Sequence, residues 1–218
     1  MYRRIGKRMF DVGLGLCLGL GLLPVMALVA LGVAVRLGRP VMFRQMRPGL
    51  DGRPFGLWKF RTMGPECAAD GRVLEDEERM NGFGRWLRAR SLDELPGLLN
   101  VLRGEMSLVG PRPLLWKYLP LYTERQMRRH AVRPGMTGLA QVNGRNALGW
   151  NERFELDLAY VDGLSFWGDL GILAATLGVV LRGGGVTSPG CATGAEFFGS
   201  AADGRRQGAG LEDRGCEP

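Results

Sequence analysis

The chain has 218 residues, of which 45% are hydrophobic, so it can bury one sizeable core but not two large domains. Its formal net charge of +7 calls for an anionic partner, which leaves nucleic acid, acidic lipid headgroups or a phosphorylated substrate. The single histidine, His130, excludes a His-rich metal site. The four cysteines lack metal-ligand spacing and are typical of reduced thiols in a cytoplasmic setting.

The first predicted element is an uncharged apolar segment at residues 12–35. As one straight helix it would measure ~36 Å, enough to cross a bilayer core. Two features favour a re-entrant helix, which bends and leaves the membrane on the face it entered. Pro24 lies at the middle of the segment, where proline breaks a helix. Basic residues flank both ends, whereas a spanning helix usually has one basic side, and these flanks favour a membrane over nucleic acid.

Residues 38–63 predict a β-hairpin, because strand-like pieces at 40–43 and 55–60 flank the turn signal Leu50-Asp51-Gly52. Arginines follow this hairpin, and they indicate either a solvated charged surface or contact with phosphates or lipid headgroups. Residues 64–80 are polar and acidic and predict a loop that leads into a short helix.

The acidic pair Asp93-Glu94 precedes a Gly-Pro-Arg-Pro turn at 110–113. A carboxylate pair can hold a divalent cation or supply a nucleophile, and an arginine between two prolines is a preorganised phosphate clamp. Arg88 adds a second cation. The same residues also have the spacing of a helix capping box, with Ser91 at N-cap and Glu94 at N3, although Pro96 fits better near the helix start with the acidic pair ahead of it. The spacing alone leaves both interpretations open.

The C-terminal half predicts further helices. Residues 114–130 indicate an interrupted amphipathic helix, and residues 151–162 a polar helix whose acidic side chains mostly face solvent. Residues 164–181 are apolar with Trp167 near their start, as in interfacial helices, and a second transmembrane helix is the alternative. Residues 183–218 have almost no apolar content and predict a disordered tail.

Four ordered segments resemble the bacterial sugar transferases, the monotopic polyprenyl-phosphate phosphoglycosyl transferases. They are 38–63 with KFRTM at its end, 91–113 (SLDELPGLLNVLRGEMSLVGPRP), 132–146 (VRPGMTGLAQVNGRN) and 157–181. The resemblance implies transfer of a sugar-1-phosphate from a UDP-sugar to undecaprenyl phosphate with release of UMP. It implies that Asp93 is the nucleophile, that Glu94 is its partner in positioning Mg²⁺, and that Arg88 and Arg112 neutralise phosphate charge.

The matched segments imply further phosphate or nucleotide contacts, at Lys59, Arg61, Arg133, Gln141 and Arg145. Two positions depart from the family pattern. A Ser-Pro pair at the break of the membrane helix is here Leu23-Pro24, and residue 97 is Gly where relatives commonly carry Gln. A turn at 133–138, whose glycines allow close backbone approach to a ligand, has a plain connecting loop as its alternative.

The expected fold is α+β and mainly helical, in a monotopic membrane protein with an N-terminal re-entrant helix, a small β-hairpin and interfacial amphipathic helices. Its expected parts are the membrane-embedded residues 1–37, a catalytic domain at 38–182 and the tail at 183–218. The resemblance places it on the cytoplasmic face of the bacterial inner membrane, with the bilayer as partner, no nucleic acid, and a homodimer left open. The alternatives are a catalytically silent scaffold of polysaccharide assembly and a basic protein that binds nucleic acid, for which motifs are lacking.

Overall fold

The computed structural model describes residues 2–65, 70–144, 147–182 and 196–199. It is mainly helical with two small sheets, which confirms the predicted α+β class. In this part of the chain the helices are α1 (Lys7–Gly21), α2 (Leu23–Arg36), α3 (Asp76–Arg79), α4 (Gly82–Ala89), α5 (Gly97–Arg103), α6 (Glu124–Met127), α7 (Leu139–Val142), α8 (Trp150–Asp162) and α9 (Phe166–Arg182). The strands are β1 (Met42–Pro48), β2 (Pro54–Phe60), β3 (Ser107–Val109) and β4 (Gly135–Thr137).

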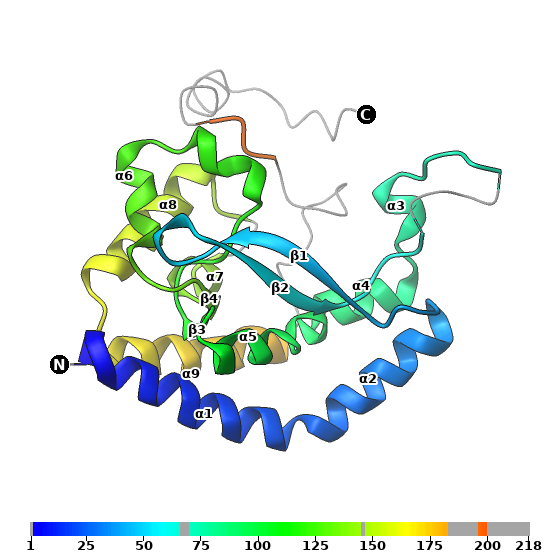
Figure 1. Ribbon diagram of the computed structural model, residues 1–218, viewed down its shortest axis with the longest axis horizontal. Coiled ribbons are helices and arrows are strands. Elements are labelled where there is room, and N and C mark those ends of the chain that lie inside the picture. Colours follow the sequence, from blue (N-terminus) through cyan, green and yellow to red (C-terminus); the bar gives the residue numbers. More distant parts are fainter. Residues whose placement is uncertain (1, 66–69, 145–146, 183–195, 200–218) are drawn as a thin grey trace.

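Helices α1 and α2 form a bent arm along one side of the molecule (Figure 1). Their axes differ by 60°, and the bend falls at Leu22, with Pro24 in the first turn of α2, where proline is tolerated. No single helix in the described ranges is long and apolar enough to span a membrane, whereas this bent pair meets the requirement jointly, by length and composition. The predicted bend near Pro24 is confirmed, and the re-entrant path through a bilayer stays a prediction.

One face of the arm packs on the body of the protein and the other is apolar and exposed. Val29 and Val33 of α2 are buried in a cluster with Phe60 and Leu87. On the outer face, large apolar side chains are half or more exposed, and they include Met9, Leu20, Leu28 and Leu31. A contiguous apolar surface of this kind is typical of a membrane or protein contact.

The predicted hairpin is confirmed, with β1 and β2 antiparallel and Met42 paired with Phe60 at its open end. The turn uses a short 3₁₀ segment, Leu50–Gly52, in which Asp51 (φ 54°) and Gly52 (φ 71°) adopt left-handed backbone. The register pairs Arg47 with Phe55, Gln45 with Leu57 and Phe43 with Lys59. Because side chains alternate along a strand, Arg47, Leu57 and Lys59 share one face of the hairpin.

A second, parallel pair of short strands, β3 and β4, was not predicted. Ser107 pairs with Gly135 and Val109 with Thr137. The backbones approach so closely that a Cβ on Gly135 would lie 2.1 Å from the Gly110 nitrogen, so only glycine fits there. This pair ties the Gly-Pro-Arg-Pro turn after β3 to the segment that carries β4.

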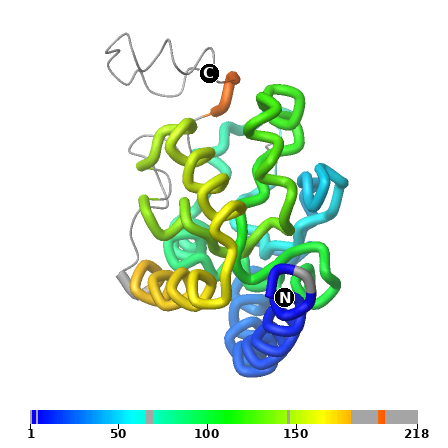
Figure 2. The backbone as a smooth tube through the Cα atoms, turned by 90° about the vertical axis from the view of Figure 1, so that its left-hand side faces the viewer, coloured from blue at the N-terminus to red at the C-terminus, as the bar shows by residue number. Residues whose placement is uncertain are grey.

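Helices α1 and α9 run along the same side of the molecule, and Figures 1 and 2 agree in this. Ile172 of α9 is buried in the main core with Val101, Leu108 and Tyr160. Trp167 is 76% exposed at the start of α9, as predicted for an interfacial helix. The interrupted helix predicted at 114–130 is also found, as a 3₁₀ segment (Trp116–Leu121), α6 and a second 3₁₀ segment (Arg128–Ala131).

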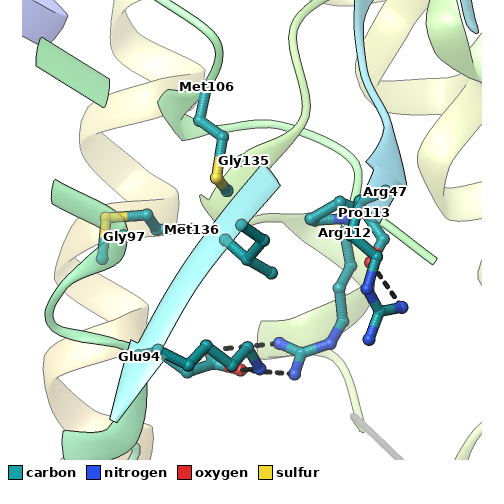
Figure 3. Close-up of a pocket in the computed structure, with 10 residues that line it drawn as sticks. Arg47, Glu94, Gly97, Met106, Arg112, Pro113, Gly135 and Met136 are labelled. Atoms are coloured by element: carbon teal, nitrogen blue, oxygen red, sulfur yellow. Dashed lines mark hydrogen bonds and ion pairs between the residues drawn. The ribbon is translucent and has the colours of Figure 1, made fainter. Parts of the chain in front are cut away.

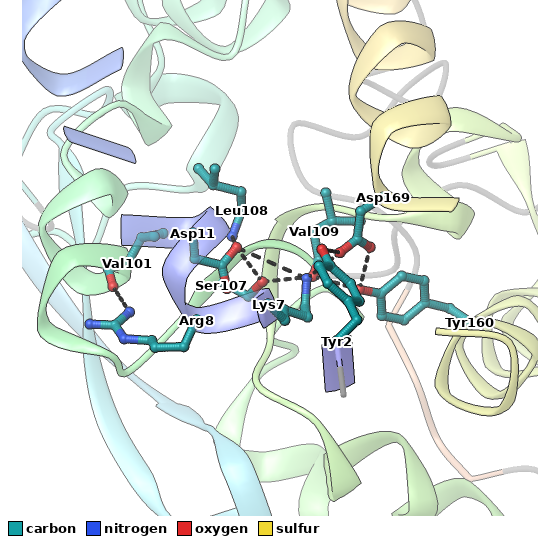
Figure 4. A network of polar contacts seen from close by, with 10 residues as sticks. All are labelled: Tyr2, Lys7, Arg8, Asp11, Val101, Ser107, Leu108, Val109, Tyr160 and Asp169. Atoms are coloured by element: carbon teal, nitrogen blue, oxygen red, sulfur yellow. Dashed lines mark hydrogen bonds and ion pairs between the residues drawn. The ribbon is translucent and has the colours of Figure 1, made fainter. Parts of the chain in front are cut away.

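A buried polar network joins the start of α1 to the rest of the protein (Figure 4). The Lys7 ammonium donates to Asp169 Oδ2 at 2.7 Å, and Tyr2 and Tyr160 donate to the same carboxylate at 2.6 and 2.8 Å. Asp11 Oδ1 accepts from the Ser107 hydroxyl at 2.9 Å and from the Leu108 amide at 3.0 Å. These contacts fix the arm to β3 and α9.

Residues 196–199 depart from the predicted disorder of the C-terminal tail. Phe197 is 1% exposed and packs among Tyr118, Tyr122, Trp150 and Phe154. The cluster also stacks on the Arg129 guanidinium, which lies 5.8 Å from the ring centres of Tyr122 and Phe154. A single phenylalanine within a polar composition is sufficient for docking here, because it fills an aromatic pocket.

Candidate active site

The acidic pair lies on a short 3₁₀ turn, Leu92–Glu94, between α4 and α5. Ser91 ahead of it adopts left-handed backbone (φ 55°), and its side chain makes no capping hydrogen bond, so the capping-box alternative is wrong. A left-handed serine costs about 1 kcal/mol or more and is held in place by the surrounding structure. Pro96 directly precedes α5, which leaves Asp93 and Glu94 ahead of that helix, as the position of the proline predicted.

Glu94 is held by two cations. The Lys59 ammonium donates to Glu94 Oε1 at 2.7 Å, and the Arg112 guanidinium donates to Oε1 at 2.6 Å and to Oε2 at 3.3 Å. Burial by itself would raise the pKa of Glu94, but Arg112 and Lys59 outweigh it and hold the pKa well below its usual range. Glu94 therefore stays ionised and orients both cations.

Asp93 differs sharply from its neighbour. Its side chain is 7% exposed, and among the described residues it makes no hydrogen bond and no ion pair within 4.0 Å. Burial, and then the adjacent Glu94 charge, raise the pKa of Asp93 to about 6, against the smaller opposing effects of Lys59, Arg88 and Arg112. The site thus keeps one carboxylate without a hydrogen-bonding partner among the described residues and with a pKa closer to neutral pH than usual. Such a pKa is common in reactive groups.

Arg112 projects from a rigid turn. Pro111 and Pro113 are buried on either side while Arg112 itself is exposed. The Gly110 amide donates to Thr137 O at 2.8 Å and the Gly135 amide donates to Pro111 O at 2.9 Å, which fastens the turn to β4. The backbone around Arg112 is therefore fixed before any ligand arrives.

A buried ion pair stabilises the backbone of the Gly-Pro-Arg-Pro turn. Arg129 pairs with Asp157 at 2.6 Å, and its Nη2 also donates to the Arg112 carbonyl at 2.7 Å. Asp157 is 3% exposed, so it is an exception to the predicted solvated face of α8, whereas Glu152, Glu155 and Asp162 are exposed. The buried pair orients the backbone that carries the clamp arginine.

The cleft beside Glu94 combines cations with an apolar floor (Figure 3). Its lining residues are Arg47, Leu57, Lys59, Glu94, Gly97, Met106, Arg112, Pro113, Gly135 and Met136. The three cations surround one carboxylate, so the cleft has an excess of positive charge suited to a diphosphate. Gly97, one of the two departures from the family pattern, lies in this wall, where Met136 packs against it at 3.7 Å from a virtual Cβ.

Arg47 is a site residue that sequence reasoning missed. It donates to Gln45 Oε1 at 2.6 Å and to Pro113 O at 3.3 Å, and burial followed by the nearby Arg112 charge lowers its pKa to about 10. The signal was present, because the turn at Leu50–Gly52 sets the register that places Arg47 on the hairpin face of Lys59. By composition alone, Arg47 is one of many basic residues along the hairpin.

The remaining predicted site residues lie apart from the cleft. Arg88 donates to Thr62 Oγ1 and to the Met63 sulfur, each at 3.0 Å, and acts on Asp93 through its charge. Arg61 donates to the carbonyls of Leu37 and Arg39, after α2.

The sites predicted in the 132–146 segment are also outside the cleft. Arg133 donates to Gly104 O at 2.7 Å and lines a second cavity. Gln141 has both amide atoms buried without a partner in the described part of the chain. Arg145 lies outside the described residues. The structure thus brings Lys59, Glu94 and Arg112 together in the cleft. Asp93 adjoins Glu94 in the chain and is not among the residues that line the cleft.

Comparison with known proteins agrees with this geometry. Residues 2–183 match the bacterial sugar transferase family. The chain is 50% identical to "Uncharacterized sugar transferase EpsL" of Bacillus subtilis, over 89% of this chain and 96% of that protein. It is 42% identical to the "UDP-glucose:undecaprenyl-phosphate glucose-1-phosphate transferase" of Caulobacter vibrioides, over 78% of this chain and 68% of the relative.

A third relative is the "Galactosyl transferase CpsE" of Streptococcus agalactiae, 37% identical over 83% of this chain. The chain spans only 43% of that protein's length, so much of the relative has no counterpart in the alignment. The match to the family covers the bent arm, the hairpin, the acidic pair and the Gly-Pro-Arg-Pro turn together. The chain belongs to the bacterial sugar transferase family.

Proposed function

We propose that this protein transfers a sugar-1-phosphate from a UDP-sugar to undecaprenyl phosphate and releases UMP, as the first membrane step in assembly of a bacterial polysaccharide or glycoconjugate. The observation that carries this proposal is the asymmetry of the acidic pair. Glu94 is fixed by Lys59 and Arg112, whereas Asp93 is buried and, among the described residues, unpaired beside it. An unpaired carboxylate keeps all of its oxygen lone pairs available for attack, whereas those of Glu94 are largely engaged by the two cations.

In the first step an Asp93 carboxylate oxygen attacks the β-phosphorus of the UDP-sugar. A new oxygen–phosphorus bond forms, the bond between that phosphorus and the oxygen bridging to UMP breaks, and UMP leaves with the bonding electrons. In the second step an oxygen of undecaprenyl phosphate attacks the same phosphorus. The Asp93 oxygen–phosphorus bond breaks, the carboxylate is restored, and the lipid carries the sugar through a diphosphate.

The cations of the cleft supply the charge stabilisation that this chemistry needs. Arg112 uses N–H groups on Glu94 but retains others, and its planar fork suits two phosphate oxygens at once. Lys59 and Arg47 face the same cleft, so negative charge that develops on the departing UMP is met by fixed cations. Arg88 lowers the cost of ionising Asp93.

Mg²⁺ is compatible with this donor set. The described residues contain no cluster of three or more His, Cys, Asp or Glu side chains, so a protein cage is lacking there. Mg²⁺ usually takes one or two carboxylates and completes its shell with water and substrate phosphates. Asp93, which has no cationic partner within 4.0 Å among the described residues, and Glu94 would hold it, and the ion would neutralise diphosphate charge. We expect EDTA to stop the reaction.

A covalent intermediate suits a site that serves a water-soluble donor and a lipid acceptor in turn. The bent arm has an exposed apolar face, and we propose that it enters the cytoplasmic leaflet of the inner membrane and returns to the same side. Cysteine labelling or reporter fusions should then place residues 1–8 and 36–60 on one side. Opposite sides would exclude the re-entrant path, though not the chemistry.

The decisive experiment omits the acceptor. Purified protein is mixed with a UDP-sugar carrying a labelled β-phosphate, and UMP release and label on the protein are followed over a single turnover. We expect about one equivalent of UMP and of protein-bound label, then transfer of that label to undecaprenyl phosphate when it is added. UMP that appears only with the acceptor would contradict the aspartyl intermediate.

A panel of UDP-sugars in the same assay identifies the donor. The named relatives include a glucose-1-phosphate transferase and a galactosyl transferase, so the family match does not select the sugar. Asp93→Asn is the matched control, because it keeps the shape of the side chain and removes the nucleophilic charge.

A further inference from the structure

A second cavity, of about 420 Å³, lies near the start of α1. It shares no lining residue with the catalytic cleft. The cleft takes Met106 and Met136, whereas the second cavity takes Ser107 and residues 131–133. The two hollows are therefore separate, although each is lined by residues next to or within the β3–β4 pair.

The second cavity is strongly cationic. Arg3, Lys7, Arg8 and Arg133 line it, together with a single acid, Asp11. Lys7 is already neutralised by Asp169 at 2.7 Å. Arg3, Arg8 and Arg133 have no carboxylate within 4.0 Å among the residues that the structure describes. The cavity therefore holds more positive charge than its own acid can balance.

Two of these arginines are held in fixed positions. Arg8 donates to Val101 O at 2.6 Å and to Leu102 O at 2.8 Å, and Arg133 Nε donates to Gly104 O at 2.7 Å (Figure 4 shows Arg8 on Val101). The Arg8 guanidinium also lies over Gly104, with Nη2 3.3 Å from a virtual Cβ there. Both guanidinium groups thus meet at the C-terminal end of α5.

Capping of α5 accounts for part of this arrangement, since cations favour the negative end of a helix. Capping leaves several N–H donors unused. Arg133 uses only Nε, so both of its Nη groups remain, and Arg3 makes no hydrogen bond or ion pair within the described residues. Like charges held close together repel one another, and an anion between them removes that cost. Guanidinium groups fixed in advance are the preferred partners of phosphate oxygens.

The surroundings of the cavity favour a lipid as the molecule that carries a phosphate into it. Leu50 and Leu164 complete its wall, and the nearby outer surface of α1 and α9 is apolar, with Met9 69% and Trp167 76% exposed. A polar hollow beside an apolar surface matches a lipid, whose headgroup enters the hollow while its chains follow the surface. A soluble phosphate would gain nothing from the apolar side.

We propose that this cavity binds the phosphate of a membrane phospholipid, as a site separate from the catalytic cleft, through Arg3, Arg8 and Arg133. Such a site would hold the start of α1 at headgroup depth. It does not depend on the chemistry assigned to Asp93, and it gives Arg133 a phosphate contact outside the cleft.

The test uses full-length protein in detergent and three probes: dioctanoyl phosphatidylglycerol, dioctanoylglycerol, which has the same chains without phosphate, and inorganic phosphate. Binding is followed by the shift in unfolding temperature and by tryptophan fluorescence. We expect phosphatidylglycerol to bind, dioctanoylglycerol not to bind at comparable concentration, and inorganic phosphate to bind more weakly. Arg3→Ala and Arg133→Ala should each weaken phosphatidylglycerol binding about fivefold, on the scale of one basic side chain at a membrane surface.

Two controls separate this site from a general effect of surface charge and from binding in the catalytic cleft. Arg53→Ala with Arg125→Ala removes two surface charges elsewhere and should leave binding unchanged. Arg112→Ala alters the catalytic cleft, so a loss of binding with Arg112→Ala but not with Arg3→Ala would assign the lipid to that cleft and overturn the proposal. Arg3→Ala removes no hydrogen bond or ion pair among the described residues, and the α5 carbonyls are bonded by Arg8 and Arg133, so its effect cannot come from loss of the α5 cap.

Unchanged phosphatidylglycerol binding in the Arg3→Ala/Arg133→Ala double variant would also overturn the site. Equal affinity for inorganic phosphate and phosphatidylglycerol would reject the lipid as the source, even if both depended on the arginines. Each result is independent of UMP release, so the failure of this proposal is distinguishable from failure of the proposed transfer reaction.

Discussion

Two regions of this protein hold a pair of buried or half-buried acids next to basic side chains, and the two pairs differ in how their charges are compensated. In the network at the start of α1, Asp169 accepts hydrogen bonds from Tyr2, Lys7 and Tyr160 at 2.6 to 2.8 Å. Asp11 accepts from a hydroxyl and a backbone amide. Each buried charge is compensated, which is the usual condition for burying a charge at all.

The pair that we propose is catalytic, Asp93 and Glu94, meets this condition for only one member. Glu94 is compensated by Lys59 and Arg112, but Asp93 is 7% exposed and has no such partner within the described residues. Burial without compensation lowers stability, so a fold keeps it where chemistry needs a reactive group. The comparison separates an acid that serves architecture from one that we propose serves catalysis.

The strongest test of this contrast is Asp93→Asn. We expect sugar-phosphate transfer and UMP release without the acceptor to fall by about 10⁴-fold or more. The other carboxylate, Glu94, is held by Lys59 and Arg112 and cannot replace Asp93 in the covalent bond. The unfolding temperature at pH 7.5 should not fall, since the variant removes an uncompensated charge. Measuring both quantities on one preparation checks the prediction, and a variant with near-normal turnover would remove Asp93 from its role.

Asp169→Ala should show the opposite pattern. The change leaves the buried Lys7 ammonium and the Tyr2 hydroxyl without their acceptor, while Tyr160 keeps the Val109 carbonyl at 2.9 Å. The unpaired ammonium should cost about 3–5 kcal/mol in the free energy of unfolding. Protein that remains folded should still release one equivalent of UMP per active molecule. Denaturant unfolding and burst titration measure the two effects. A variant of full stability but no burst would mean that the network takes part in the reaction.

Arg112 lies between these extremes, because it both compensates Glu94 and faces the cleft. We expect Arg112→Lys to lower kcat/KM by about tenfold, since the cation remains but its planar fork is lost, and Arg112→Ala to lower it by about 10²-fold or more. The buried prolines on both sides should keep the turn in place. A loss of melting temperature in step with activity would show instead that Arg112 acts only on the fold.

The sequence predicted local elements well where their signals are local. The hairpin was evident from its turn and alternation, and the bend near Pro24 from a proline within an apolar segment. The acidic pair and Arg112 were found because a rigid Pro-Arg-Pro turn and a carboxylate doublet are visible as patterns. That Glu94 would hold Arg112 was not visible, since α5 and β3 separate the two residues in the chain and the contact depends on how these elements pack.

What the sequence could not supply was long-range pairing. The parallel strands have three residues each and carry no pattern, so their existence depends on close approach of glycines distant in the chain. Lys7 and Asp169 meet only after α1 and α9 are packed. Phosphate contacts for Arg61 and Arg133 were inferred from matched segments. In the structure both side chains lie outside the cleft and donate to carbonyls at helix ends, Arg61 to Leu37 and Arg133 to Gly104.

The smallest expected effect concerns pH and depends on Asp93 alone. Because burial and Glu94 raise its pKa to about 6, kcat/KM should be about tenfold lower at pH 5 than well above pH 7, falling with one protonation. Stability should respond in the opposite direction. Between about pH 4 and pH 6 the folded protein holds a proton on Asp93 that the unfolded chain has released, so this contribution stabilises the fold at low pH and is lost as pH rises.

The Asp93→Asn variant lacks that proton exchange, so the difference in unfolding free energy between variant and parent isolates it. We expect the difference to shift in favour of the variant by up to about 3 kcal/mol as pH rises from 4 to 7, the value of about two pKa units. Glu94, whose pKa is depressed in the folded protein, should contribute the reverse slope from about pH 5 downward, where the unfolded chain takes up a proton that folded Glu94 does not. A pH-independent difference would mean that Asp93 is compensated in solution, and the contrast between the two acidic regions would then disappear.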